Sequence, residues 1–379
     1  MAGRAQGVET HAAERREIRS LGIESPGHPY IWSYLEEPLA EGSFQVETIY
    51  SGLSAGTELT FLKGTNPYLH ASWDERLGAF DHSASGLGYP MPFLGYMEVG
   101  RVAASRTTAV ETGAVVAMTY GHKTGHSASA AAEFFTVLDG DLDPLLGIYA
   151  AQMGPICANG LLHAAAEAGG TQARGLEDGV AGRRVLVQGA GVVGLLTGLW
   201  ARHLGAESVA VADATPARLA AAEALGLIPL DDAGGQAWRW VKEEWRRDAG
   251  GGGADVVFQC RGNAAALASA LRSLRPQGAV IDLAFYQDGA GDLRLGEEFH
   301  HNGLSIRCAQ ISRVPSGLQD RWSRSRLAGE TLEFLHAHGE LLLEHVVTDV
   351  VPLDEGPEFL RDLAQRRRHT IQAVFDMRA

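Results

Sequence analysis

Hydrophobic residues follow two different patterns along the chain, and the change between them divides it. From Phe44 to Val137, short apolar runs such as FQVETIYSG, EVGRVAAS and AVVAMTY are separated by glycine and proline. Runs of this kind predict β-strands, and their number predicts an all-β region of the barrel type. The first twenty residues are polar almost throughout, and we expect a frayed terminus there.

From about Asn159, predicted strands alternate with predicted helices. The strands fall over 184–188, 208–212, 255–259 and 279–284, and the helices over 159–168, 192–204, 215–225, 236–247 and 264–274. Such alternation is typical of parallel βαβ units. After Pro315 a helix over 325–338 precedes two β-type runs, VVTDVVPL and TIQAVFDM. We therefore predict an α/β domain over 159–311 and a second domain assembled from 1–158 and 312–379.

A glycine-rich loop lies where the first predicted parallel strand meets its helix. Gly189, Gly191 and Gly194 form G-x-G-x-x-G between strand 184–188 and helix 192–204, which is the context that a dinucleotide-binding loop requires. The first glycine allows a tight turn, the second lets the backbone approach a pyrophosphate, and the third lets helix and strand pack closely. Backbone amides and the helix dipole then hold the phosphates.

An acidic residue follows at the place that such a loop predicts. Asp213 ends the next predicted strand, where a carboxylate accepts hydrogen bonds from the adenosine ribose and repels a 2′-phosphate. NAD is therefore favoured over NADP as the cofactor. Arg218 lies one turn into the following helix, where it either flanks the ribose or belongs to the surface.

Composition narrows the classes of partner. Lys+Arg 32 and Asp+Glu 46 give a formal net charge of −14, which disfavours nonspecific nucleic acid binding. The longest apolar run, Val185 to Trp200, is interrupted by Gln188 and by glycines, and is too short for a span of about 20 residues. No targeting segment is recognised. We expect a soluble, cytoplasmic protein that acts on a small molecule, with no nucleic acid or membrane partner.

Six segments carry a resemblance to a known family. They are SGLSAGTE (51–58), LGYMEVGRV (94–102), the glycine loop with Asp213, ADVVFQCRGN (254–263), LRPQGAVIDLAFY (274–286) and the closing TIQAVFDM. In these segments the chain resembles the medium-chain dehydrogenase/reductase superfamily. The resemblance implies an α/β Rossmann domain, with a doubly wound parallel sheet, inserted in a GroES-like β-barrel catalytic domain. It also implies hydride transfer with a nicotinamide in the cleft, a homodimer or homotetramer, and cofactor contacts from Val192, Val193, Cys260 and Phe285.

The sequence departs from the family's zinc-dependent members at the metal positions. Those members carry a cysteine in G-I-C-G-T-D, a His-Glu pair in G-H-E-x-x-G and a further cysteine before Thr-Gly. Here Ser54 or Ala55 falls on the first cysteine, and Tyr96 and Met97 fall on the His-Glu pair. The third position falls near Pro155, where the closest cysteine, at 157, is expected to be a small buried apolar residue.

Catalytic zinc needs three protein ligands from cysteine, histidine or carboxylate. We therefore expect no zinc and no other metal. The pattern S-G-x-S-x-G-T-E, with G-Y in place of G-H-E, resembles the zinc-free branch that includes bacteriochlorophyllide a dehydrogenase. Without a metal, a side chain has to stabilise or protonate the developing alkoxide during hydride transfer.

Tyr96 is the first candidate for that task, because the resemblance places it at the vacated histidine position. The alternative is a buried aromatic residue whose hydroxyl only bonds to the vacated site. Thr57 matches the threonine that relays protons in zinc-dependent members. Ser54 is a further candidate catalytic residue, also through its hydroxyl.

Other polar residues near the expected cleft have less certain assignments. Asn159 is predicted to face the nicotinamide or the substrate and to act with the catalytic set. Glu58 and His163 are expected to be structural. The polar loop over 121–126 is expected to be solvated surface, and the charged run over 366–369 an exposed turn.

The segment between Ser54 and Tyr96 is longer than in zinc-dependent members. A long irregular loop in a compact domain is usually functional or disordered. An insertion here would border the substrate cleft, so its rings are candidates for recognising a cyclic substrate. The rings belong to Tyr68, His70, Trp73, Phe80, His82 and Tyr89.

Three functions stay open. The first is a zinc-independent, NAD-dependent dehydrogenase acting at a secondary alcohol or ketone on a hydroxylated ring or polyol, such as a sugar, a cyclitol or a specialised metabolite. The second is reduction of an activated C=C bond, as in zinc-free quinone and enoyl reductases. The third is a catalytically silent dinucleotide-binding protein.

Overall fold

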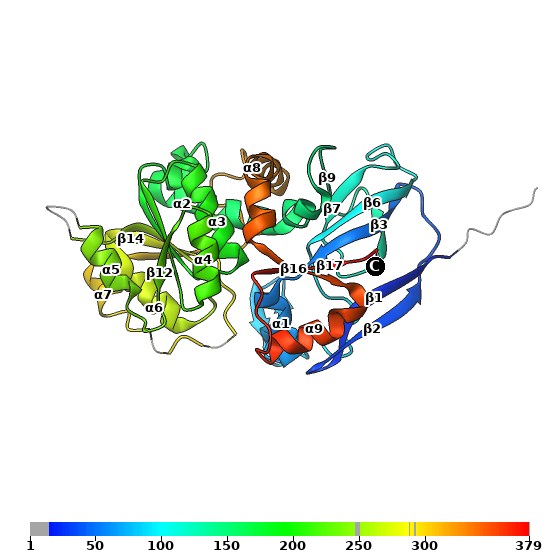
Figure 1. Ribbon diagram of the computed structural model, residues 1–379, viewed down its shortest axis with the longest axis horizontal. Helices are drawn as coiled ribbons and strands as arrows, with labels where there is room; N and C mark the ends of the chain where they lie inside the picture. Colours follow the sequence, from blue (N-terminus) through cyan, green and yellow to red (C-terminus); the bar gives the residue numbers. More distant parts are fainter. Residues whose placement is uncertain (1–14, 247–250, 288, 292, 379) are drawn as a thin grey trace, which may run out of the picture.

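The computed structural model describes residues 15–246, 251–287, 289–291 and 293–378. They form two lobes side by side, an α/β lobe and a β-rich lobe (Figure 1). Each lobe is built on one large sheet.

The α/β lobe contains a six-stranded parallel sheet in the order β12-β11-β10-β13-β14-β15. Its strands are β10 (Arg184–Gln188), β11 (Ser208–Asp213), β12 (Ile228–Asp231), β13 (Ala254–Gln259), β14 (Leu274–Asp282) and β15 (Ser305–Cys308). Its helices are α3 (Val192–His203), α4 (Pro216–Ala224), α5 (Ala237–Glu244), α6 (Ala264–Ser273) and α7 (Glu298–His301).

Helices cover both faces of this sheet because alternate strand residues point to opposite sides. Val185 and Val187 of β10 pack in one apolar cluster with α3 and α4, whereas Leu186 packs in another with α5 and α6. The chain order reverses at β10, which lies between β11 and β13. In such a doubly wound sheet, ligands bind at the carboxyl ends of the strands beside this reversal.

The β-rich lobe contains a seven-stranded sheet in the order β16-β17-β3-β6-β7-β9, with β8 paired to β3. Its strands are β3 (Ser43–Gly52), β6 (Glu98–Ser105), β7 (Val115–Met118), β8 (Gly125–Ser129), β9 (Thr136–Val137), β16 (Val347–Pro352) and β17 (Gln372–Asp376). Strand β17 pairs with β3 through Val374 and Gly52, so distant parts of the chain share one sheet. The predicted fold class, a Rossmann domain inserted in a GroES-like domain, is confirmed.

Two small hairpins and three helices complete the β-rich lobe and its junction. The hairpins are β1 (Glu17–Ser25) with β2 (His28–Leu35), and β4 (Ser72–Asp74) with β5 (Ala79–Asp81). The helices are α1 (Ala55–Lys63), α8 (Arg324–His345) and α9 (Gly356–Ala364). Single turns of 3-10 or π helix occur at Pro67–Leu69, Pro144–Leu146, Tyr149–Met153, Gly170–Gln172, Glu177–Gly179 and Leu353–Glu355.

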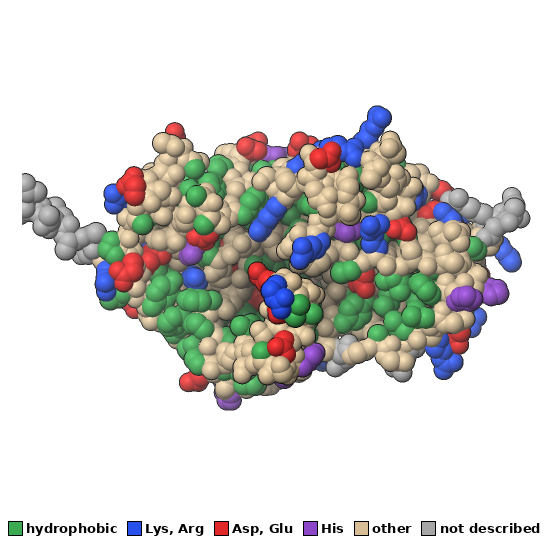
Figure 2. All heavy atoms as spheres, turned by 180° about the vertical axis from the view of Figure 1, so that it is seen from behind, with side chains coloured by type: hydrophobic (Ala, Val, Ile, Leu, Met, Phe, Trp, Pro, Cys, Tyr) green, Lys and Arg blue, Asp and Glu red, His purple; other side chains and the backbone are tan. Residues whose placement is uncertain are grey.

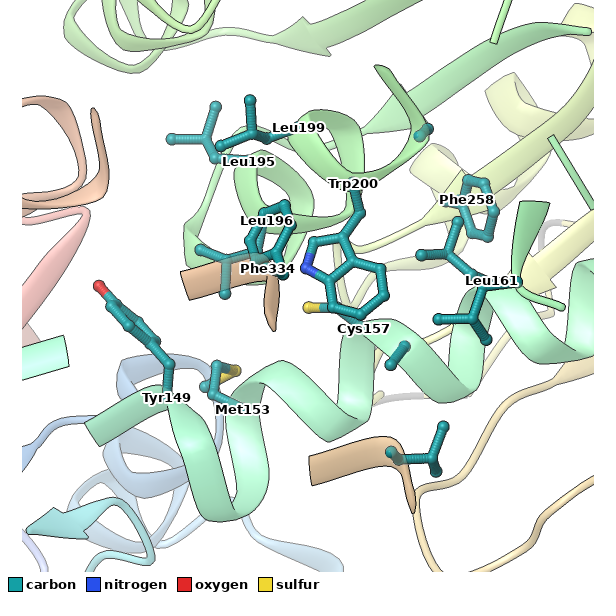
Figure 3. Packing of buried hydrophobic residues seen from close by; sticks show 14 of the residues in the cluster. Tyr149, Met153, Cys157, Leu161, Leu195, Leu196, Leu199, Trp200, Phe258 and Phe334 are labelled. Carbon is teal, nitrogen blue, oxygen red and sulfur yellow. The ribbon is translucent and has the colours of Figure 1, made fainter. Parts of the chain in front are cut away.

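Helix α2 (Gly154–Gly169) lies at the centre of the largest apolar cluster, which contains residues of both lobes. Cys157 of α2 lies against Trp200 of α3, which packs beside Phe334 of α8, and Leu161 of α2 lies beside Phe258 of β13 (Figure 3). The helical run Pro144–Gln172 is long and apolar enough to cross a membrane by length and composition alone. Its most apolar window is 83% buried inside the protein, as in the core helix of a folded domain.

The structure corrects several predicted elements. Residues Glu17 to Ser20 belong to β1, and Ser20 is fully buried, so the frayed terminus was wrong for this part of the first twenty residues. Residues 1–14 lie outside the described part. The helix predicted from Asn159 begins at Gly154, since Pro155 occupies its first turn, where proline is tolerated. The strands β12 and β15 were missed because each has only four residues.

Phe334→Ala tests the central packing. Phe334 is 2% exposed and its ring centroid lies 4.7 Å from that of Trp200. Truncation of a buried phenylalanine leaves a cavity, and we expect the free energy of unfolding to fall by about 3–5 kcal/mol, measured by denaturant titration. The control is Leu35→Ala, at a side chain that is 58% exposed, with an expected change within about 0.5 kcal/mol. Equal unfolding midpoints for the two variants would contradict this packing.

Candidate active site

The glycine loop joins β10 to α3 at the reversal point of the sheet. Gly189 has φ +105°, a conformation that side chains other than glycine rarely adopt. A Cβ on Gly194 would lie 1.8 Å from the carbonyl oxygen of Gly189, so helix and strand approach too closely for any other residue. Gly191 caps α3 without a side-chain hydrogen bond, and a Cβ there would meet open space. The free amides of this helix end therefore face the cleft, as phosphate binding requires.

Asp213 ends β11 beside this loop. Its carboxylate accepts hydrogen bonds from the backbone N–H of Ala190 at 2.9 Å and of Thr215 at 2.8 Å. The Arg218 guanidinium lies 3.9 Å from the same carboxylate and also donates to the carbonyl of Thr370, at 3.2 Å, in the other lobe. Asp213 thus fixes the glycine loop and keeps its remaining lone pairs at the edge of the cleft.

The two lobes enclose a cavity of about 380 Å³ between them. Seen from behind, the surface is hollowed between the lobes (Figure 2). The structure brings twelve of the thirteen predicted site residues to this cavity. They are Ser54, Thr57, Tyr96, Gly189, Gly191, Val192, Val193, Gly194, Asp213, Arg218, Cys260 and Phe285.

Asn159 is the exception, and its predicted place in the cleft was wrong. It is fully buried in α2, and its amide nitrogen donates to the carbonyl of Gln310 at 3.0 Å. His163, one turn further on, bonds to the carbonyl of Arg313 at 2.8 Å. Both side chains therefore anchor the loop that follows β15, as expected for His163 but not for Asn159.

The cavity is also lined by residues that were not identified from the sequence. Arg261 and Gly262 follow β13 at the same edge of the sheet, a place that the parallel-strand rule predicts. Others were not named as cofactor or catalytic candidates, although several lie in the segments that carry the resemblance. They are Ala55, Gly56, Met153, Ile156, Ala214, Thr215, Leu283, Ala284, Gln287, Thr370 and Ile371.

On the β-rich side, the hydroxyls of Tyr96 and Ser54 form a hydrogen bond with each other. Burial raises the pKa of Tyr96; hydrogen bonds with Ser54 and Thr57 oppose that rise, and the nearby carboxylates of Glu58 and Glu98 add to it. The phenol is therefore protonated throughout the neutral range. In this form the hydroxyl of Tyr96 can donate a hydrogen bond to an oxygen atom in the cleft.

Behind this pair lies a chain of buried polar groups. Glu58, in the first turn of α1, accepts the backbone N–H of Ser54 with one carboxylate oxygen and contacts His122 Nε2 with the other, both at 2.7 Å. His122 Nδ1 lies 2.6 Å from Ser51 Oγ, which donates to Glu98 at 2.9 Å. Glu58, Glu98 and His122 are each at most 2% exposed.

His122 also corrects the interpretation of the loop over 121–126 as solvated surface. Its ring is fully buried, and Lys123 is only 7% exposed. Because the loop is short and polar, nothing in its sequence distinguished a buried histidine from an exposed one. The run over 366–369 is exposed, as expected.

The segment inserted between Ser54 and Tyr96 reaches the other lobe. Thr65 Oγ1 donates to the side-chain oxygen of Gln287, a cavity residue, at 2.7 Å. Further along the insertion, the rings of Tyr68 and Trp73 pack edge-on against Phe80, and each of the three is 38–39% exposed. The start of the insertion thus borders the cleft, while these rings lie outside the set of cavity residues.

Comparisons with known proteins agree with this architecture. A family model described as a zinc-binding dehydrogenase matches residues 192–323. The chain is 33% identical over 175 residues to the D-guloside 3-dehydrogenase of Escherichia coli (strain K12), covering 46% of this chain and 49% of that protein. It is 35% identical over 195 residues to the sorbitol dehydrogenase of Bacillus subtilis (strain 168), covering 51% and 50%. The chain thus spans about half the length of the curated relatives it matches.

Among solved structures, the alcohol dehydrogenase TADH from Thermus sp. ATN1 superposes with a TM-score of 0.71. The superposition covers 94% of this chain and 99% of that chain at 20% identity, and it establishes the shared two-lobed fold. The chain is thus similar to zinc-binding dehydrogenases over residues 192–323, and it shares the two-lobed fold of an alcohol dehydrogenase. The positions that resemble the zinc site of such proteins can therefore be inspected directly.

The side chains at those positions do not form a zinc-binding set. The hydroxyls of Ser54 and Tyr96 bond to each other, and Met97 is fully buried. Cys157 is buried in α2 as expected; burial raises its thiol pKa to about 12, and its Sγ lies 3.6 Å from the carbonyl of Val193. Within the described residues, no group of three histidine, cysteine or carboxylate side chains is placed to hold a metal ion. Zinc prefers thiolate, imidazole or carboxylate ligands, which these hydroxyls do not supply.

Gly191→Ala and Gly194→Ala test the phosphate loop as a pair. Since a Cβ at residue 191 meets open space, this variant should keep the wild-type unfolding temperature. Its methyl group would stand where a pyrophosphate approaches the backbone, and we expect the Kd for NADH to rise at least about tenfold, or about 1.4 kcal/mol. Gly194→Ala should instead lower the unfolding temperature. Fluorescence titration and thermal unfolding measure both effects, and wild-type NADH affinity in Gly191→Ala would contradict the assignment.

Proposed function

We propose that this protein is a zinc-independent, NAD-dependent oxidoreductase that interconverts a secondary alcohol and a ketone on a hydroxylated ring or polyol. The observation that carries the proposal is the meeting of two half-sites in one cavity. The glycine loop and Asp213 line one side, and Tyr96, Ser54 and Thr57 line the other. A cofactor held by the first set would bring its nicotinamide toward the second.

The residues of the α/β lobe fit a dinucleotide. The uncapped N-terminus of α3 would hold the pyrophosphate, and Asp213 would accept the ribose hydroxyls. The same carboxylate would repel a 2′-phosphate, which supports NAD over NADP. When bound, the nicotinamide supplies the acceptor or donor of a hydride.

The residues of the β-rich lobe would handle the substrate oxygen. Tyr96 would donate its phenolic proton toward the carbonyl oxygen of a ketone, and Ser54 would orient that phenol through the hydrogen bond between them. The donor set described above does not suit zinc, which supports a reaction that these hydroxyls carry alone. The names of the two curated relatives, a guloside dehydrogenase and a sorbitol dehydrogenase, support a polyhydroxylated substrate.

The inserted segment is our candidate for substrate selection, because its Thr65 hydroxyl bonds to Gln287 at the cavity. Assembly as a homodimer or homotetramer and a cytoplasmic location stay predictions from the sequence. A C=C reductase and a silent dinucleotide-binding protein are the outcomes that the following experiment separates from our proposal.

A spectrophotometric screen tests the proposed reaction. The purified protein is mixed with NAD⁺ or NADP⁺ and a panel of sugars, cyclitols and acyclic polyols, and the absorbance of the reduced cofactor is followed. We expect turnover with NAD⁺ and at least one polyol, with a lower kcat/KM for NADP⁺ because Asp213 opposes the 2′-phosphate. Reduction of quinones or enones with NADPH in place of polyol turnover would favour the C=C reductase. Tight NADH binding with no turnover on any substrate would favour the silent protein.

Tyr96→Phe tests the phenol as proton donor. Loss of a positioned general acid typically lowers kcat by about 10²–10⁴-fold, and we expect a loss in this range for ketone reduction. Since burial raises the Tyr96 pKa, the donor form persists in the wild type until the pH exceeds the ordinary tyrosine value of about 10. Wild-type kcat should therefore stay level through the neutral range and fall only at higher pH, and the variant should lack that fall. A variant with wild-type kcat would exclude the phenol as the donor.

A further inference from the structure

We propose that His122 is a positioning residue of the candidate active site: a buried imidazolium that holds Glu58 in place and thereby fixes Ser54 against Tyr96. The inference deepens the proposed function and rests on it for its kinetic part. Its structural part concerns the resting protein alone. No part of the sequence resemblance assigned a role to this histidine.

The hydrogen-bond pattern defines the protons on the ring. Ser51 has one hydroxyl proton and gives it to Glu98, so the contact between Ser51 Oγ and His122 Nδ1 needs a proton from the ring. The contact between His122 Nε2 and Glu58 likewise needs a ring proton, because an ionised carboxylate only accepts. With Glu98 ionised, both ring nitrogens therefore carry protons and the imidazole is charged. Burial raises the pKa of Glu98, and a protonated Glu98 would instead donate to Ser51 and leave Nδ1 without a proton, so the count of ring protons decides between the two states.

Because these groups are buried, their charges strongly affect the pKa of His122 and the stability of the cluster. Removal from water alone would lower the His122 pKa, but the carboxylates of Glu58 and Glu98 outweigh that effect, and the net pKa is raised. Glu98 also accepts the backbone N–H of Tyr120 at 2.7 Å, so its two oxygens are both bonded. An unpaired buried carboxylate is costly, and the imidazolium is the cation placed between these two.

The surroundings of the ring leave it no alternative position. A Cβ on Gly95 would lie 2.6 Å from His122 Cε1, so the ring occupies room that only glycine leaves free. Phe375 of β17 packs edge-on against the ring, with centroids 4.8 Å apart. Other ionisable groups also interact with the Glu58–His122–Glu98 cluster: Tyr96 with both carboxylates, and Lys123 and Tyr120 with Glu98.

The cluster reaches the cavity through the backbone. Glu58 receives the N–H of Ser54, and the Ser54 hydroxyl bonds to the Tyr96 phenol. If His122 is replaced, Glu58 loses the partner of its second oxygen and can leave the Ser54 amide. Ser54 and Tyr96 would then lose their fixed separation, and the charge near the phenol would become more negative.

Nuclear magnetic resonance of the wild-type protein, labelled with ¹⁵N-histidine, tests the charge without requiring turnover. The His122 signals are assigned by their proximity to the Phe375 ring. We expect two protonated ring nitrogens at pH 7.5, where an ordinary histidine, with a pKa of about 6.5, is mostly neutral. A single protonated nitrogen would overturn the proposal. Two protonated nitrogens in a protein that turns over no substrate would leave the charge assignment standing and refute the proposed function instead.

His122→Gln tests the positioning role in the active protein. We expect kcat to fall by up to about a hundredfold, the loss typical of a displaced catalytic group, while the KM for NAD⁺ stays unchanged because the cofactor loop lies in the other lobe. His126→Gln is the matched control: His126 belongs to the same region and bonds to one carboxylate, Glu133, at 2.7 Å. In the described structure it makes no hydrogen bond to the Glu58–His122–Glu98 cluster. Its kcat should be that of the wild type. Equal kcat in both variants would overturn the positioning role, and if His122→Gln does not fold, the spectrum of the wild type still decides the charge.

Discussion

The burial of α2 between the two lobes is the interaction on which the candidate site depends. The largest apolar cluster includes Val99 from β6 and Met97 just before it, Cys157 and Leu161 from α2, and Val187 from β10. This shared core fixes the two sheets relative to one another, and the cavity lies where their edges meet. A close-packed core resists small displacements, since each lost contact costs dispersion and hydration free energy. The half-sites can therefore be formed by separate lobes and still face each other.

Electrostatics places a second constraint on the β-rich side. Three ionisable side chains, Glu58, Glu98 and His122, are almost fully removed from water within one small region. Such groups persist only when they are paired and hydrogen-bonded. The pairing continues to Ser54 and Tyr96, so the same bonds that satisfy the buried charges also orient the hydroxyls at the cavity. The position of these hydroxyls therefore depends on an unbroken series of hydrogen bonds from the buried charges.

The sequence was most informative where a local rule dictates structure. β10 was predicted with its observed bounds, and the glycine loop and Asp213 were placed correctly, because strand alternation, glycine geometry and the end of a strand are local features. Asn159 was assigned to the cleft because the resemblance gave its position on the helix but not the face it occupies. Its burial against the Gln310 carbonyl depends on a loop far along the chain.

The burial of His122, like that of Asn159, could not be predicted from the local sequence. Its loop is rich in glycine and polar residues, which favours solvent exposure. The ring is buried because Glu58, Ser51 and Glu98 come from three separate elements and converge on it. Convergence of this kind is a property of the sheet pairing between β3 and β6, and no single segment of sequence contains it.

Zinc-independent hydride transfer from a polyol to NAD⁺ is tested most directly by isotope labelling. Protein freed of metal by dialysis against a chelator, with its zinc content measured, is incubated with NAD⁺ and polyols deuterated at the carbinol carbon. We expect one deuterium to appear in the reduced dinucleotide at substoichiometric zinc. Transfer that occurs only after zinc is restored, or no transfer from any polyol while NADH still binds, would contradict this expectation.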